Sequence, residues 1–359
     1  MTFRRLSLLI LTAALGISLA GCDVIGSDSN DCSIRGNGVV FANQGIFQSN
    51  ENDGSVGFYN STFDEVTCES IGEFNSIVQS ISVQENTLYA TANNAGRLDI
   101  YDLPNTSQIG KLTGLVGPRY LTLPDDNTVF LTDQQPFNSS DPDSIRAIGL
   151  NDSSPTITAS IAVSGTVAGI THTTDRVYAA LGGFGVNPKV AILNEDNATL
   201  EEEIDIGCTS RFVLADEQDE VFALCNNATT GEAVVLDGRR IQKRISLSDS
   251  VETTGAFGQD AYYAPTTEEL YVVIGKEQVV RIDTRSNKKS AKITPKGSGP
   301  IGAVGYNSQN ERLYVGRADP SAPFEAKGTI IIHNRDGEKI GTFTAGIFPD
   351  FIDFRRVHE

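Results

Sequence analysis

Residues that could carry catalysis are few in this chain of 359 residues. It has three histidines, His172, His333 and His358, and none falls in a recognised catalytic or metal-ligand spacing. The sequence also lacks the GxSxG, HExxH, phosphate-loop and dinucleotide-binding patterns. We interpret His172 as a structural residue of a strand, with a general base as the alternative. The sequence therefore predicts a protein that is not an enzyme, with no catalytic residue, metal site or cofactor.

Bulky aromatic residues are the better candidates for chemistry, and that chemistry would be ligand binding. Four long segments expected to be loops each carry a single phenylalanine: Phe47 in residues 43–54, Phe137 in 133–144, Phe184 in 182–188 and Phe324 in 316–328. An exposed ring on a loop tip suits the clamping of a large flat or apolar ligand. The alternative is that each ring only pins its own loop to a neighbouring element.

The first cysteine ends a leader sequence. Arg4 and Arg5 precede an apolar run over residues 6–19, which is too short to span a bilayer comfortably. The sequence Leu19-Ala-Gly-Cys22 resembles the lipobox of bacterial lipoproteins, which implies cleavage after residue 21 and lipid on Cys22. Several acyl chains anchor a protein stably to a membrane. The alternative is an ordinary secretory signal with an incidental cysteine.

Four cysteines remain after Cys22, an even number that suits disulfides in an oxidising compartment. Cys208 and Cys225 flank an expected hairpin near residues 216–217, so they could face each other across it. Cys32 and Cys68 would then tie the N-terminal lead-in to the outer part of the first repeat. Buried free thiols are the alternative.

The elements that position these residues form a repeat. Residues 77–112 read as four short strands separated by Asn, Gly and Pro turns. The second strand carries an aliphatic–aromatic pair that recurs seven times, at intervals from 41 residues (Tyr89 to Phe130) to 49 (Phe222 to Tyr271). A small antiparallel sheet must stack on copies of itself to cover its faces. The sequence thus predicts an all-β fold, a seven-bladed β-propeller of four-stranded antiparallel blades.

The ends of the chain predict how the ring closes. The first repeat lacks its own first strand, whereas residues 348–357 supply a spare strand. We expect this C-terminal strand to join the first blade and leave no long edge open. The expected organisation is a signal peptide (1–21), a lipidated cysteine with a polar tether (22–32) and one propeller domain (33–359).

Loop length predicts which face binds. The loops between second and third strands lie on the same face as the connections between blades, and four of them are long. Extra length on one face of a repeat protein usually marks the binding face. Arg119 enters a first strand from such a connection, so it should lie near the channel mouth and could bind an anionic or amide group. Pairing with one of the many carboxylates is the alternative.

The charge of the chain restricts its partners. The formal net charge is −18, which repels nucleic acid and anionic membrane surfaces. We expect a monomer in the cell envelope, attached to the membrane by its lipid. An outer-membrane location is favoured, with the leaflet left open.

The repeat Leu88-Tyr-Ala-Thr and Leu98-Asp-Ile-Tyr-Asp102 resembles the YVTN-type, YncE-like propellers of envelope and surface-layer proteins. Gly38-Val-Val-Phe-Ala-Asn-Gln-Gly45 and Gly117-Pro-Arg-Tyr120 look like a narrower group of outer-membrane lipoprotein propellers that accompany TonB-dependent transporters. One branch of that group captures cobalamin at the cell surface. Gln44 stands where that group commonly has Glu, so any role of the acid in ligand or ion binding is in doubt for this chain.

Three function classes follow, in order of preference. The first is a ligand-capturing lipoprotein, which could hold a small molecule such as cobalamin for a TonB-dependent transporter. The second is a scaffold that binds another envelope protein through the same long loops. The third is a propeller enzyme of the lactonase or quinoprotein type, against which the scarcity of histidine counts.

Overall fold

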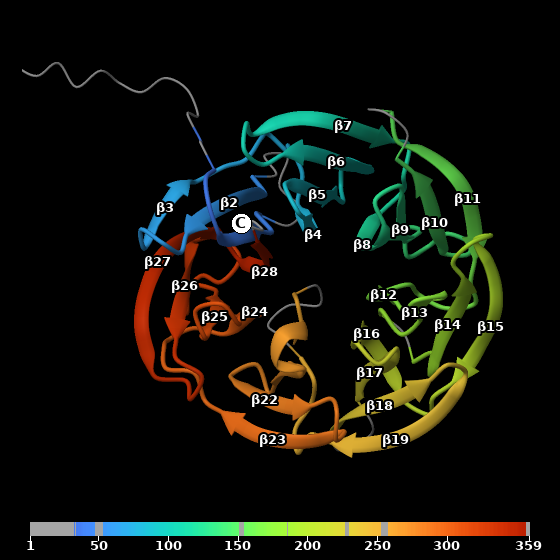
Figure 1. Ribbon diagram of the computed structural model, residues 1–359. Helices are drawn as coiled ribbons and strands as arrows, with labels where there is room; N and C mark the ends of the chain where they lie inside the picture. The colour runs from blue at the N-terminus through green and yellow to red at the C-terminus, as the bar shows by residue number, and fades with distance from the viewer. Residues whose placement is uncertain are drawn as a thin grey trace, which may run out of the picture. The chain divides into compact units, whose positions relative to one another are not determined.

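The computed structural model describes residues 32, 34–46, 53–150, 154–184, 186–226, 230–252 and 258–356. The chain from residue 31 onward forms one compact unit. Within it lie seven four-stranded antiparallel sheets arranged as the blades of a propeller (Figure 1). The predicted fold class is confirmed. No helix in the described ranges is long and apolar enough to cross a membrane.

The strands are numbered along the chain, and the innermost strand of each blade is named first. Blade 1 contains β28 (Pro349–Arg355), β1 (Gly38–Asn43), β2 (Ser55–Asn60) and β3 (Glu65–Cys68). Blade 2 contains β4 (Val78–Gln84), β5 (Thr87–Ala92), β6 (Arg97–Asp102) and β7 (Ser107–Thr113). Blade 3 contains β8 (Pro118–Asp125), β9 (Thr128–Asp133), β10 (Ser144–Gly149) and β11 (Thr156–Ala162). Blade 4 contains β12 (Ile170–His172), β13 (Arg176–Ala180), β14 (Lys189–Asn194) and β15 (Thr199–Asp205).

The remaining blades follow the same order. Blade 5 contains β16 (Thr209–Ala215), β17 (Glu220–Asn226), β18 (Gly231–Asp237) and β19 (Arg240–Ser246). Blade 6 contains β20 (Ala261–Ala264), the 3-10 turn η1 (Pro265–Thr267), β21 (Glu269–Ile274), β22 (Gln278–Asp283) and β23 (Lys288–Ile293). Blade 7 contains β24 (Ile301–Asn307), β25 (Arg312–Arg317), β26 (Lys327–His333) and β27 (Lys339–Ile347).

The ring closes through the C-terminal strand, as predicted. β28 pairs antiparallel with β1, from Gly38 opposite Arg355 to Asn43 opposite Pro349. Figure 1 shows the red end of the chain beside the blue beginning. Aromatic side chains then pack blade 7 against blade 1, with Tyr59 stacked on Phe343 at 4.4 Å between ring centroids. Closure therefore rests on both backbone pairing and side-chain packing.

The repeated aliphatic–aromatic pairs lie on the second strand of every blade and are buried between blades. Both predicted disulfides are present, Cys32–Cys68 and Cys208–Cys225. The first joins the lead-in to β3, the outer strand of blade 1, and the second joins the neighbouring strands β16 and β17.

Antiparallel order gives the propeller two different faces. The turns from first to second and from third to fourth strands form one face, which we call the hairpin face. The loops from second to third strands and the connections between blades form the other, which we call the long-loop face.

Candidate functional site

Two of the predicted loop-tip aromatics meet on the long-loop face. Phe137, between β9 and β10, and Phe184, between β13 and β14, form an edge-to-face pair with ring centroids 4.9 Å apart. Their loops belong to the neighbouring blades 3 and 4. Aromatic rings that contact each other are usually buried, but Phe137 is 74% exposed and Phe184 is 38% exposed. The two rings therefore contact each other and keep enough exposed surface to receive a ligand.

The buried side chain of Arg119 contacts the Phe184 ring of this pair. It lies in β8, is 2% exposed, and its guanidinium carbon is 4.8 Å from the centre of the Phe184 ring. Its Nη1 donates a hydrogen bond to Oε1 of Gln134 at 2.8 Å. Burial lowers the pKa of Arg119 from its ordinary value. A guanidinium under an aromatic ring adds a cation–π attraction that fixes the ring.

Two carboxylates hold the loop that carries Phe137. Asp133, at the end of β9, accepts hydrogen bonds from the backbone N–H groups of Val116 and Gly117 at 2.9 Å. Asp143 accepts from the N–H groups of Gln135 and Val167 at 2.7 and 3.0 Å. Both ends of the loop that carries Phe137 are therefore hydrogen-bonded to the connections between blades.

Phe324 and Gln44 lie together elsewhere on the same face, between blades 7 and 1. The Phe324 ring is 5.0 Å from that of Phe348, whose carbonyl accepts from the Gln44 N–H at 2.9 Å. Gln44 is buried, and its Nε2 has no hydrogen-bond partner among the described residues. Nearby lies a cavity of about 280 Å³ lined partly by Glu325 and Lys327.

The predicted binding residues therefore fall into two groups. Phe137, Phe184 and Arg119 form one group, and Phe324 with Gln44 forms the other. Phe47 and the lipidation candidate Cys22 lie outside the described residues. Whether these side chains bind a ligand stays a prediction.

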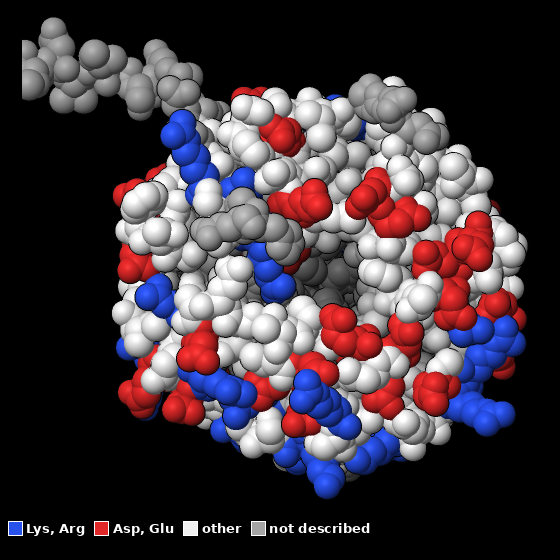
Figure 2. Space-filling view, in the orientation of Figure 1, with Lys and Arg blue, Asp and Glu red and all other residues white. Residues whose placement is uncertain are grey.

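The opposite, hairpin face holds a cavity that the sequence reasoning did not anticipate. A funnel of about 840 Å³ opens where the first strands of several blades end. Figure 2 shows this central hollow with carboxylate side chains gathered along its rim. The only sequence signal was the recurrence of acidic residues in the turns that follow first strands, as at Glu85 and Asp219.

His172 lines this funnel at the end of β12. Its Nδ1 lies 2.7 Å from Oγ1 of Thr122. Burial lowers the pKa of His172, so the ring is neutral at pH 7. A neutral ring bonded to a threonine fits the structural interpretation made from the sequence.

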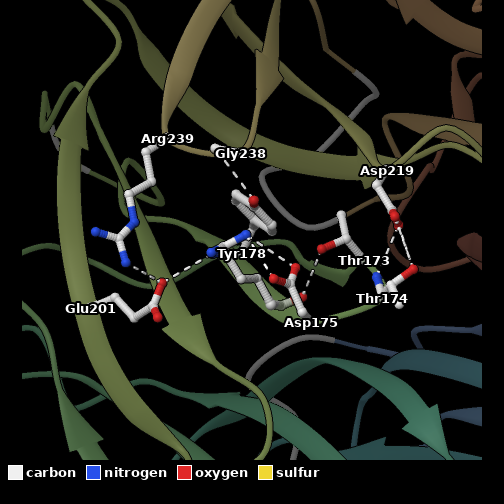
Figure 3. A network of polar contacts seen from close by, with 9 residues as sticks. Thr173, Thr174, Asp175, Tyr178, Glu201, Asp219, Gly238 and Arg239 are labelled. Carbon is white, nitrogen blue, oxygen red and sulfur yellow. Dashed lines mark hydrogen bonds and ion pairs between the residues drawn. The ribbon is translucent and has the colours of Figure 1, made fainter.

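Polar contacts join blades 4 and 5 beside the funnel (Figure 3). Asp219 accepts from the N–H and Oγ1 of Thr174 at 2.9 and 3.0 Å. Farther out, Glu201 accepts from Arg176 at 3.0 Å and from Arg239 at 2.8 Å. Hydrogen bonds and ion pairs thus join blades 4 and 5 beside the funnel.

The chain matches one protein family over most of its length. The family described as "Domain of unknown function (DUF5074)" matches residues 37–348, and the chain belongs to it. No curated protein sequence matches the chain.

Solved structures share the fold at low sequence identity. The chain is similar to the periplasmic gluconolactonase PpgL of Pseudomonas aeruginosa, with 13% identity, a TM-score of 0.67, and coverage of 90% of this chain and 100% of that one. It is also similar to a quinonprotein alcohol dehydrogenase-like protein of Bacteroides thetaiotaomicron, with 13% identity and a TM-score of 0.66. That match covers 88% of this chain and 78% of the other. A functionally unknown protein of Desulfotomaculum acetoxidans has 10% identity, a TM-score of 0.66, and coverage of 90% and 100%. Identities this low establish the fold and carry no activity to this chain.

Proposed function

We propose that this protein is a non-catalytic lipoprotein of the cell envelope that captures a ligand on its long-loop face. One observation carries the proposal: the Phe137–Phe184 pair stands exposed above the buried Arg119. Exposed apolar rings that lie together commonly mark an interaction site, and here the Arg119 guanidinium lies against the Phe184 ring. The arrangement supports a binding surface rather than a loop that merely packs.

The ligand we propose is a large molecule with flat apolar faces and polar edges, such as cobalamin. Rings would cover its faces, and the loop backbone would meet its polar groups. The recipient we propose is a TonB-dependent outer-membrane transporter. The resemblance of the lead-in and of Gly117-Pro-Arg-Tyr120 to capture lipoproteins supports both assignments.

Calorimetric titration tests the capture role. The protein from residue 23 contains every strand of the closed ring and would be titrated with cyanocobalamin. We expect one-to-one binding that weakens roughly tenfold or more in the double variant Phe137→Ala, Phe184→Ala, since buried aromatic contacts are each worth about 1 kcal/mol or more. Phe63→Ala is the matched control, because Phe63 is 69% exposed in the turn after β2 on the hairpin face. If no heat of binding is measured at high concentrations of cyanocobalamin, cobalamin is not the ligand.

A protein partner is the second candidate, and one observation favours it. Val186 is 89% exposed next to the loop tip of Phe184, which widens the apolar surface beyond what a small ligand needs. Affinity capture from detergent-solubilised envelopes, with the same double variant as control, separates the two. Recovery of one protein partner by the native chain alone, without cobalamin binding, would select the scaffold role.

The membrane anchor is also part of the proposal. The lipobox-like Leu19-Ala-Gly-Cys22 supports lipid attachment at Cys22, and the resemblance to outer-membrane lipoprotein propellers supports location at the outer membrane. We expect Cys22→Ser to move the protein from the membrane fraction to the soluble envelope fraction. Membrane retention of that variant would contradict the anchor.

A further inference from the structure

The funnel on the hairpin face has unbalanced negative charge. Its lining includes six carboxylates: Glu85, Glu195, Asp216, Glu217, Asp219 and Asp353. None of the six forms an ion pair with a lysine or arginine of the described chain, although Arg356 also lines the funnel. Six carboxylates against one arginine leave an excess of negative charge, which raises the local concentration of cations.

Two of these carboxylates also carry unused acceptor atoms in buried positions. Asp216 is 7% exposed; its Oδ1 accepts from the N–H groups of Gln218 and Glu220, but its Oδ2 has no partner among the described residues. Oε2 of Glu195 is likewise buried and unpartnered within the described ranges. Burial, and then the charges of Asp125 and other nearby acids, raise the pKa of Glu195. Buried acceptors without donors are costly, so a ligand that donates hydrogen bonds here would be favoured.

The funnel leads inward to a second, smaller chamber of about 160 Å³. The two spaces share four lining residues, Ser82, Thr171, Tyr262 and Asp353, so they adjoin each other. Most of the residues that line the inner chamber are apolar, among them Ile81, Leu121, Ile170, Val213, Leu214 and Ile352. Four aromatic residues also line it: Tyr120, Phe212, Tyr262 and Phe351. The Tyr120 ring lies 5.5 Å from that of Phe212 and 6.4 Å from that of Phe351 between centroids. An acidic entrance thus precedes an apolar end.

We propose that this funnel is a second ligand site that takes a small organic cation with an apolar body. The ammonium group would lie among the carboxylates of the rim, and the apolar part would enter the inner chamber. Tyr262 lines both spaces and Tyr263 lines the funnel, and aromatic rings attract cations.

The spacing of the carboxylates favours an organic cation over a bare metal ion. Calcium and magnesium need several oxygen ligands around one point. In the described part of the chain, the funnel's carboxylates and His172 form no group of three ligands close enough together to hold one metal ion. Dispersed carboxylates suit a larger cation that several of them surround.

Ligand-observed nuclear magnetic resonance and calorimetry test this with phenethylamine as the probe. It has one ammonium group and a ring small enough for the inner chamber. 2-Phenylethanol matches it without the charge, and spermidine supplies charge without a ring. We expect phenethylamine to bind the protein from residue 23 at roughly millimolar concentration or tighter, and to bind better than both comparison compounds. Added salt should weaken that binding.

Two sets of variants show whether the funnel carboxylates themselves bind phenethylamine or whether any loss of negative charge weakens its binding. Glu195→Gln with Glu217→Gln keeps side-chain size and should weaken phenethylamine binding roughly tenfold. Glu338→Gln, an exposed acid in the turn between β26 and β27, should leave it unchanged. Absence of binding, equal binding of 2-phenylethanol, tighter binding of spermidine, or an unaffected double variant would each overturn the proposal. Since the funnel lies on the opposite face, cyanocobalamin binding on the long-loop face bears on none of these outcomes.

Discussion

At the scale of single residues, the closing strand β28 contains a buried acid in an unusual state. Asp350 is 0% exposed, and neither of its carboxylate oxygens has a hydrogen-bond partner among the described residues. Burial raises the pKa of Asp350 well above its ordinary value. On the same strand, burial raises the pKa of Asp353 to about 6. The folded protein therefore holds protons on this strand more tightly than the unfolded chain does.

This state predicts the sign of a pH effect. The pKa of Asp350 is higher in the folded protein than in the unfolded chain, where it is about 4. Protonated Asp350 therefore contributes its full stabilisation below about pH 4, and this stabilisation is lost as the pH rises through the folded-state pKa. Asp350→Asn, which is neutral at every pH, should raise the melting temperature at pH 8 and change it much less at pH 4. The exposed Asp237→Asn is the matched control. An equal shift at both pH values, measured by circular dichroism, would contradict this assignment.

At the scale of elements, short-range chemistry determines the turns. The third strands β2, β6, β14 and β22 end in Asn or Asp, and at each the side-chain oxygen accepts from a backbone N–H two or three residues later, as when Asp102 accepts from Asn105 at 3.2 Å. These are Asx turns. Strands, turns and the Cys208–Cys225 disulfide could be predicted because each depends on neighbours in sequence or on a hairpin. Cys32–Cys68 is then predicted as the remaining pair.

The Cys32–Cys68 disulfide is predicted to be the more stabilising of the two. It spans 36 residues, whereas Cys208–Cys225 spans 17, and a longer closed loop restricts the unfolded chain more. Replacing Cys32 and Cys68 by Ser should reduce the free energy of unfolding by roughly 3–4 kcal/mol in urea titrations. The Cys208→Ser, Cys225→Ser pair should lose somewhat less. An unchanged urea midpoint for the first pair would show that the lead-in contributes nothing to stability.

The arrangement of the site could not be predicted in the same way. Phe137 and Phe184 meet because their blades are neighbours in the ring, whereas Phe324 belongs to blade 7 and packs on Phe348 instead. The funnel likewise gathers strand ends from several blades, such as His172 and Asp353. Loop length identifies a face, but the position of each side chain around the ring depends on blade packing, which spacing along the chain does not show.

At the scale of the whole molecule, one strand completes the ring. β28 pairs with β1 in blade 1 and carries Phe354, which packs against Tyr314 of blade 7 at 5.7 Å between ring centroids. Deletion of residues 349–359 should therefore expose the edge of β1 and remove cooperative thermal unfolding, unlike most terminal deletions. Deletion of residues 357–359 alone, which spares β28, should leave the melting curve nearly unchanged. A cooperative melt of the longer deletion would contradict closure by this strand.

Closure gives the molecule two faces with different chemistry, and the proposed capture role belongs to the face that carries Phe137 and Phe184. Hydrogen–deuterium exchange of the protein from residue 23, with and without cyanocobalamin, would show which face the ligand covers. We predict slower exchange in residues 134–143 and 181–184 when the ligand is present. Slower exchange confined to the hairpin face, or no change at a saturating concentration, would contradict ligand capture on the long-loop face.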